Sequence, residues 1–173
     1  IGNQGNGVTL GIFDPNDSII SNVIAFNDFG IQVNSSANDN LFYFNSIYSN
    51  LSGGINIDNG GQKDIIPPTV DSLSADSVLY GTASMDALIQ VYADYGDQGQ
   101  FFLDTTLAND AGNWSKKLST FPENSIFKAL QDSAGNTSAF SNSLNLNSPL
   151  TVINTNDNGI GSLRAAIDSA NNW

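Results

Sequence analysis

The sequence predicts an all-β protein made of stacked parallel rungs, a two-sheet sandwich and one short C-terminal amphipathic helix. Three observations lead to this prediction. The first sixty or so residues repeat a short strand pattern, and residues 69 to 146 alternate strand-like runs with turn clusters. The acidic residues are nearly all Asp, which favours turns, whereas Glu123 is the one Glu, a residue type that favours helices.

The repeat begins at three glycines, Gly7, Gly30 and Gly54, each followed by a β-branched, a polar and an aliphatic residue. A second pattern, Asn22–Asn27 and Asn45–Asn50, recurs in phase with it. A period just above twenty residues with short strands is typical of a solenoid, because one rung cannot bury its own inner face. Each glycine is expected at a bend that needs either a positive φ or close packing.

Stacked rungs place like residues above like residues, so the repeat predicts specific neighbours. We expect Ile24 to lie against Ile47, and Asn27 and Asn50 to form a ladder at a turn. We also expect one inward column, made of Val8, Ile31 and Ile55. The pattern resembles the right-handed parallel β-helix of the pectate-lyase-like class. The resemblance implies that residues 1–64 are a short remnant of such a β-helix.

The stiff pair Pro67-Pro68 follows a turn-rich stretch and indicates a domain boundary before residues 65–147. The motifs Gly112-Asn113-Trp114-Ser115 and Asp132 to Ser138 resemble bacterial Ig-like repeat domains. That resemblance implies a β-sandwich, with Trp114 as its core anchor. The expected strands are Thr69–Leu73, Val78–Ala83, Leu88–Ala93, Gln100–Leu107, Asn113–Leu118, Ser125–Leu130 and Ser138–Leu146.

The last stretch, residues 148–173, predicts a strand followed by a helix. Ser162 is a candidate N-cap, and apolar residues after it share one helix face. The run Gly161-Ser162-Leu163-Arg164-Ala165-Ala166-Ile167 resembles the segment that opens another class of bacterial surface β-helices, although many relatives have Cys where this chain has Gly161. In that class the helix covers the open first rung. The expected apolar face is Leu163, Ala166, Ile167 and Ala170.

Composition excludes several function classes. The chain has no Cys and no His, which removes Cys nucleophiles, His bases and typical zinc sites. A formal charge of −12 repels phosphate backbones, so nucleic acid is not an expected partner, and no apolar run is long enough to span a membrane. We expect no enzyme activity and no catalytic residues, because the acids of the repeat lie in turn-forming stretches. Those acids are Asp14, Asp17, Asp28, Asp39 and Asp58.

Two kinds of binding site stay open at this point. Calcium, which prefers several oxygen ligands, is the one cofactor we consider, with Asp94, Asp97 and Asp104 near one end of the sandwich and Asp64 and Asp132 near the domain junction. The structural alternative is that these residues end strands. For a glycan, the candidates are Tyr43 and Tyr48, which belong to an aromatic cluster in one rung.

The leading hypothesis is a non-enzymatic structural or adhesive repeat module of a large secreted or cell-surface bacterial protein. The alternatives are a non-catalytic fragment of a β-helix carbohydrate-active enzyme and a calcium-dependent glycan-binding module. Expected partners are other repeats of the parent chain and a surface glycan or protein receptor. Because cut rungs expose sheet edges, we expect another copy or residues 150–173 to cover the open end of the solenoid.

Overall fold

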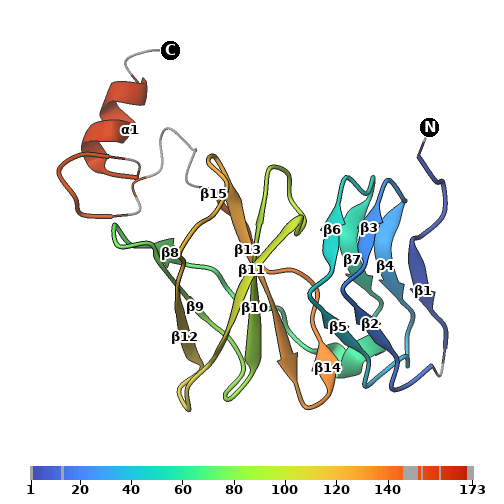
Figure 1. Cartoon of the computed structure of the whole chain (residues 1–173). Coiled ribbons are helices and arrows are strands. Elements are labelled where there is room, and N and C mark those ends of the chain that lie inside the picture. The colour runs from blue at the N-terminus through green and yellow to red at the C-terminus, as the bar shows by residue number, and fades with distance from the viewer. Residues whose placement is uncertain (1, 13, 146–151, 153, 160, 171–173) are drawn as a thin grey trace.

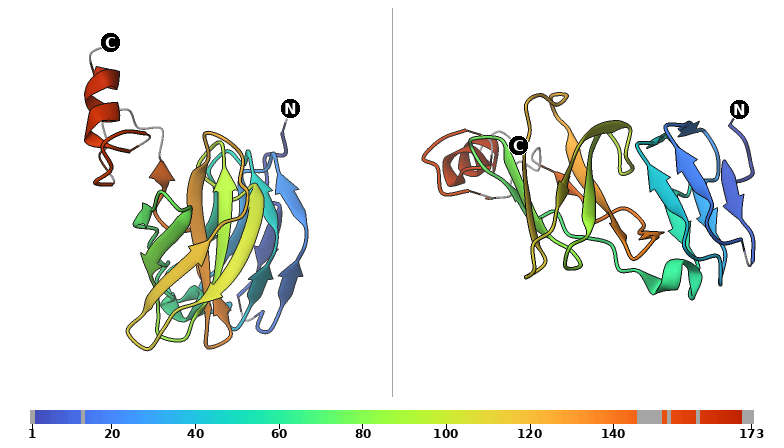
Figure 2. Two further views of the ribbon diagram at one scale, coloured as in Figure 1. Left: turned by 60° about the vertical axis from the view of Figure 1, so that its left-hand side comes forward. Right: turned by 60° about the horizontal axis from the view of Figure 1, so that its bottom comes forward.

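The computed structural model describes residues 2–12, 14–145, 152, 154–159 and 161–170. Over these residues the fold is mostly β-sheet with one short α-helix, so the all-β prediction is confirmed. Parallel strands lie at one end, two antiparallel sheets follow, and α1 (Leu163–Ala170) lies at the other end (Figures 1 and 2).

Residues 2–64, here named the parallel part, wind through three short parallel sheets. Each turn of chain is a rung: β1, β2 and β3 form rung 1, and β4, β5 and β6 form rung 2. A third rung begins with β7 and the 3-10 turn η1 (Gly61–Asp64). The strand bounds are β1 Val8–Leu10, β2 Ser18–Ile20, β3 Val23–Ala25, β4 Phe29–Val33, β5 Leu41–Tyr43, β6 Ser46–Tyr48 and β7 Gly53–Ile57.

The predicted stacking of the rungs is confirmed. Ile31 pairs with Val8 on one side and with Ile55 on the other, and Ile24 pairs with Ile47. Ile31 and Ile47 are fully buried in an apolar cluster that runs along the inside of the rungs. Burial of like residues in register therefore fixes the rung period.

Asparagine side chains tie the rungs together at their corners. The Asn27 N–H donates to Asn50 Oδ1 at 3.1 Å, and Asn50 Nδ2 donates back to the Ile24 carbonyl at 3.1 Å. Asn45 makes the same pair of bonds to rung 1, and Asn40 does so at the third corner. The predicted Asn27–Asn50 ladder is confirmed, and it is one of three.

The residue before each of these asparagines has a left-handed backbone. Such a φ is unfavourable for residues other than Gly, Asn and Asp, yet it turns the chain sharply enough to let the asparagine face the neighbouring rung. The corner pairs, each 23 residues apart, are Asn16 and Asp39, Ser21 and Phe44, and Phe26 and Ser49.

The repeated glycines serve close packing, because none of the three has a positive φ. A Cβ on Gly7 would lie 2.7 Å from the Gly30 carbonyl oxygen, and a Cβ on Gly30 would lie 2.5 Å from that of Gly54. Neighbouring rungs thus approach through their backbones at this column. Only glycine leaves room for that approach.

Residues 69–145, here named the antiparallel part, form two sheets around one apolar core. One sheet has the order β11-β10-β13-β14, with β15 also paired to β13, and the other has the order β12-β9-β8. Trp114 is buried in the core between them, as predicted. The bounds are β8 Ser72–Leu73, β9 Val78–Thr82, β10 Leu88–Asp94, β11 Phe101–Leu107, β12 Asn113–Lys117, β13 Ile126–Ser133, β14 Asn136–Thr137 and β15 Leu144–Asn145.

The predicted strands match these elements closely, except at two places. The first strand is shorter than predicted, Ser72–Leu73, although the N–H groups of Thr69 and Asp71 also donate to β9 carbonyls at 2.8 Å. The predicted strand Ser138–Leu146 is wrong over most of its length. There the hydroxyls of Ser138 and Ser141 accept bonds from β13 N–H groups, at 3.0 and 2.9 Å, in place of a regular backbone ladder.

Strand β10 is buried on both faces. Ile89 and Val91 point into the core of the antiparallel part, whereas Gln90 and Tyr92 point the opposite way and are equally buried. The second face is covered by the parallel part, which stacks against this sheet (Figure 1). The two parts therefore share a joint with fully buried polar side chains.

Candidate functional site: the joint between the two parts

The joint forms where rung 2 meets the antiparallel part. The Ile47 N–H donates to the Gly99 carbonyl at 3.0 Å, and the Gly99 N–H donates back to the Ile47 carbonyl at 2.8 Å. Nearby, the Phe42 N–H donates to Thr137 Oγ1 at 2.9 Å. These bonds take up backbone groups of β5 and β6 that would otherwise form the open edge of the last complete rung.

At this edge Gln90 takes the place of the asparagine that a further rung would stack above Asn45. Its Oε1 accepts from the Phe44 N–H at 3.0 Å, and its Nε2 donates to the Phe42 carbonyl at 2.7 Å. The same amide donates to Asp132 at 2.9 Å and accepts from the Tyr92 hydroxyl at 3.0 Å. All of its hydrogen-bonding capacity is therefore used in the buried joint.

Two more glutamines end the other asparagine columns. Gln98 accepts from Asn50 Nδ2 at 2.9 Å and donates to the Asn50 carbonyl at 2.7 Å. Gln62 accepts from the Asn40 N–H at 3.1 Å and donates to the Thr137 carbonyl at 3.1 Å. Two columns thus end on Gln90 and Gln98 of the antiparallel part, and the third ends on Gln62 of η1, so the open end expected on this side is covered within the chain. Neither another copy nor residues 150–173 is needed there.

Aromatic rings cross the same joint. Phe44 of rung 2 packs edge to face on Phe102 with ring centroids 4.9 Å apart, and Phe102 contacts Tyr92 at 5.6 Å. Tyr92 in turn contacts Phe140 at 5.5 Å. This chain of rings gives the joint an apolar component beside its hydrogen bonds.

Asp132 is buried beneath the joint, where it accepts hydrogen bonds from Gln90 and Thr137. Burial raises the pKa of Asp132 to about 6, although both hydrogen bonds act in the opposite direction. Burial, followed by the negative charge of Asp132, also raises the pKa of Tyr43 and of Tyr92. The joint therefore contains one carboxyl that gains a proton on folding in mild acid.

This shift predicts a pH-dependent stability. Between about pH 4 and pH 6 the folded chain binds a proton at Asp132 that the unfolded chain does not, so stability falls by about 2–3 kcal/mol as pH rises through this window. Asp132→Asn should remove that fall in urea unfolding curves measured across the window. An unchanged pH dependence in Asp132→Asn would show that another group is responsible.

The five carboxylates considered for calcium all have protein partners. Asp94 accepts from the N–H groups of Gly96 and Gln98, at 2.9 and 3.1 Å. Asp64 accepts from the Gly60 N–H at 2.6 Å, and Asp132 lies in the joint. The last two candidates form ion pairs: Asp97 with Lys128 at 2.8 Å and Asp104 with Lys116 at 2.5 Å.

Within the described ranges, no three acidic side chains form a group that would hold a metal ion. Melting curves in calcium and in chelator test the calcium hypothesis directly, since a ligand bound to the native state alone raises the melting temperature. A melting temperature that rises with calcium would support a site at these carboxylates, and an unchanged one would count against it.

The two tyrosines considered for a glycan lie on different sheets. Tyr43 ends β5 and lies beside Phe44, with ring centroids 5.7 Å apart. Tyr48 ends β6 and packs edge to face against Phe26 of rung 1 at 5.9 Å. Both tyrosines are half-buried, so each presents part of its ring to solvent.

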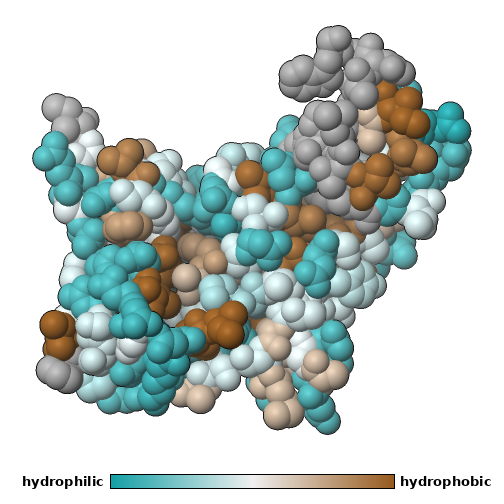
Figure 3. Space-filling model, turned by 180° about the vertical axis from the view of Figure 1, so that it is seen from behind, coloured by the Kyte–Doolittle hydropathy of each residue, from teal (hydrophilic) through white to brown (hydrophobic). Residues whose placement is uncertain are grey.

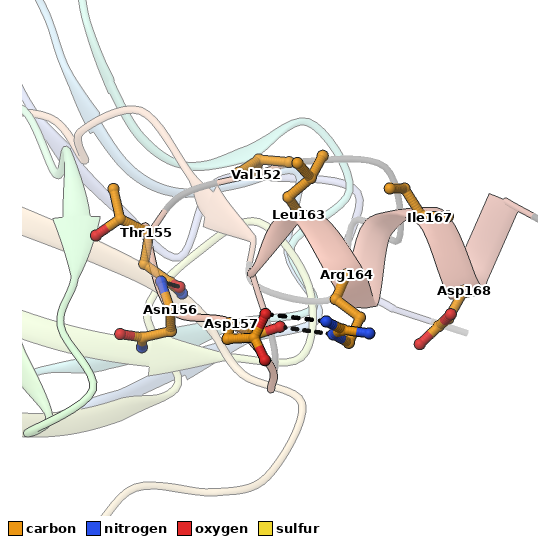
Figure 4. A pocket seen from close by; sticks show the side chains of 9 residues that line it. Val152, Thr155, Asn156, Asp157, Leu163, Arg164, Ile167 and Asp168 are labelled. Atoms are coloured by element: carbon orange, nitrogen blue, oxygen red, sulfur yellow. Dashed lines mark hydrogen bonds and ion pairs between the residues drawn. The ribbon is translucent and has the colours of Figure 1, made fainter.

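The C-terminal helix is confirmed, and the Ala165 N–H donates to Ser162 Oγ at 3.2 Å, which confirms the predicted N-cap. Of the strand expected before it, residues 148–151 and 153 lie outside the described residues, and residues 152 and 154–157 form no strand, so that prediction is wrong where it can be compared. A pocket lies along the helix, where Arg164 binds Asp157 beside exposed apolar side chains (Figure 4). Hydrophobic side chains also gather at this segment in Figure 3; the exposed ones are Val152, Leu163 and Ile167.

The residues that build the joint were not anticipated from the sequence. Gln62, Gln90 and Gln98 attract no attention by type or spacing. One signal was available: Gln90 interrupts an otherwise apolar strand, Leu88–Ala93, and a polar residue in such a strand must find a buried partner. Thr137 belongs to a motif noted only for its resemblance to Ig-like domains.

Neither protein-family models nor curated proteins match the chain. Within the described residues, no helix has the length and apolar character required to cross a bilayer.

Proposed function

We propose that the chain is a non-enzymatic structural and adhesive module of a large secreted or cell-surface bacterial protein. In this proposal the parallel part belongs to a right-handed parallel β-helix, and the antiparallel part is a bacterial Ig-like sandwich. The parallel pairing at a 23-residue period and the two antiparallel sheets around Trp114 support these assignments.

One observation carries the proposal: the antiparallel part ends the rungs by supplying their missing hydrogen bonds. Gln90, Gln98, Gly99 and Thr137 bind backbone groups of a rung as another rung would. A flexible tether between two independent modules would need no such set of buried bonds. A joint of this kind holds two modules at a fixed angle, which suits a protein that extends from a surface.

The C-terminal segment fits the same plan. The capped helix with its exposed apolar side chains supports the proposal that residues 148–173 open a further β-helix. The parent protein would then alternate rungs and sandwiches, and other repeats of that protein would be its nearest partners.

Rigidity of the joint can be measured by pulsed EPR. The chain has no native Cys, so spin labels at Ser18→Cys in β2 and Ser119→Cys after β12 would report one distance across the joint. Both positions are exposed. We expect one narrow distance distribution in the otherwise unchanged chain, and a broader one after Gln98→Ala. A broad distribution in the unchanged chain would contradict the proposal.

A further inference from the structure

One aromatic residue at a left-handed corner lies outside the joint. Phe26 has φ 63, a left-handed backbone, and 59% of its surface is exposed. The equivalent corner of rung 2 holds Ser49, which shows that a small polar residue suits the position. The corner turn accounts for the backbone of Phe26 but not for its large exposed ring.

Phe44, the other aromatic residue at a left-handed corner, differs from Phe26 in its surroundings. Its ring packs on Phe102 and its N–H is held by Gln90, so the joint offsets its strain. Phe26 lies one rung further from the joint, and its ring meets Tyr48 edge to face at 5.9 Å. The Phe26–Tyr48 pair places two aromatic rings, inclined at 77° to each other, at this corner of the rungs.

The strands around this pair are unusual for the chain because they contain no charged residue, and Asp28 lies only at their edge. Residues 18–27 and 41–57 contain no Asp, Glu, Lys or Arg, in a chain with 17 acidic residues and a formal charge of −12. Ile20 and Val23 are exposed on the same rung as Phe26, at 49% and 72%. We name the outer side of β2, β3, β5 and β6 the uncharged face.

Polar groups border the Phe26 ring of this pair. A groove beside Phe26 is also lined by Gln4, Asp28, Ser49 and Leu51. Amide, carboxylate and hydroxyl groups at the edge of an aromatic surface offer hydrogen bonds to a ligand that also has an apolar side.

We propose that the uncharged face binds a neutral glycan, with Phe26 and Tyr48 as its stacking residues. A pyranose ring has an apolar C–H side that packs on an aromatic ring, and hydroxyls that bond to the polar edge. An anionic glycan would be repelled by the negative charge of the chain. The inference rests on the adhesive part of the proposed function and names the ligand class and the residues that would contact it.

The experiment is electrophoresis in native gels that contain a soluble polysaccharide. The probes are three neutral polymers (xyloglucan, galactomannan and laminarin) and one acidic polymer, polygalacturonate. We expect retardation by at least one neutral polymer and none by polygalacturonate. Phe26→Ser should weaken binding by about tenfold or more, because it removes one ring face. Met85→Ser, which removes an exposed apolar side chain on the antiparallel part, should bind as the unchanged chain does.

Phe26→Ser places at the corner the residue type found in rung 2, so its melting temperature should not fall, and a lost interaction then reflects binding. Absence of retardation by all three neutral polymers, or equal retardation of Phe26→Ser, would overturn the inference. Self-association that Phe26→Ser abolishes, without retardation, would instead identify an interface between copies. None of these outcomes bears on the EPR distances across the joint, so the two proposals can fail separately.

Discussion

Replacing Gln90 with leucine is expected to lower the free energy of unfolding by roughly 3–5 kcal/mol. Leucine is similar in size but leaves the Phe44 N–H, the Phe42 carbonyl, Asp132 and the Tyr92 hydroxyl without this partner. Unsatisfied buried polar groups cost about 1–3 kcal/mol each, and the protein relaxes to recover part of that loss.

Urea unfolding followed by tryptophan fluorescence measures this loss, because Trp114 is buried in the core. Gln4→Leu, at an exposed glutamine remote from the joint, is the matched control and should change stability by less than about 0.5 kcal/mol. Gln98→Leu removes fewer hydrogen bonds than Gln90→Leu does. Its loss of unfolding free energy should therefore lie between those of Gln90→Leu and Gln4→Leu. Equal stability of Gln90→Leu and Gln4→Leu would mean that the joint contributes little.

A second large loss, about 3 kcal/mol or more, is expected for Gly30→Ala, which introduces overpacking between rungs. The added methyl would lie 2.5 Å from the Gly54 carbonyl oxygen and 2.7 Å from Ile47 Cγ2. A backbone oxygen cannot move without separating β4 from β7, so the strain would spread along the ladder that joins them.

Gly5→Ala is the control for that substitution, because its methyl would meet Asn3 at an ordinary 3.7 Å and Gly5 has no positive φ. Hydrogen exchange of the β4 and β7 amides gives a local reading beside the global stability. If Gly30→Ala retains the exchange rates and stability of Gly5→Ala, the glycine column does not limit rung spacing.

The parallel part could be predicted from the sequence because its repeat follows directly from the stacking of the rungs. Each rung buries the same inward positions, so Val8, Ile31 and Ile55 recur in phase and their register follows from the period. The ladder of Asn27 and Asn50 was predictable for the same reason. The sequence left open whether the repeated glycines adopt a positive φ or allow two backbones to approach closely, because glycine is favoured in both situations.

The strands of the antiparallel part were also readable from turn clusters and apolar runs, and Trp114 from its motif. The segment after Thr137 could not be predicted in this way. There the hydroxyls of Ser138 and Ser141, instead of backbone carbonyls, accept the β13 N–H groups, and this leaves no mark in the hydrophobic pattern. For the five candidate carboxylates, residue type alone suggests calcium, and the fold adds which N–H groups, hydroxyls and lysines they contact.

The sequence by itself determined an all-β chain, the 23-residue rung, the capped C-terminal helix and the absence of Cys and His chemistry. These features depend on local pattern and composition, which can be read directly from the sequence. The tertiary structure decided the joint. Gln90, Gln98 and Thr137 are distant in sequence from the rungs they complete, and only folding brings their side chains to the backbone groups of Phe42, Phe44 and Asn50.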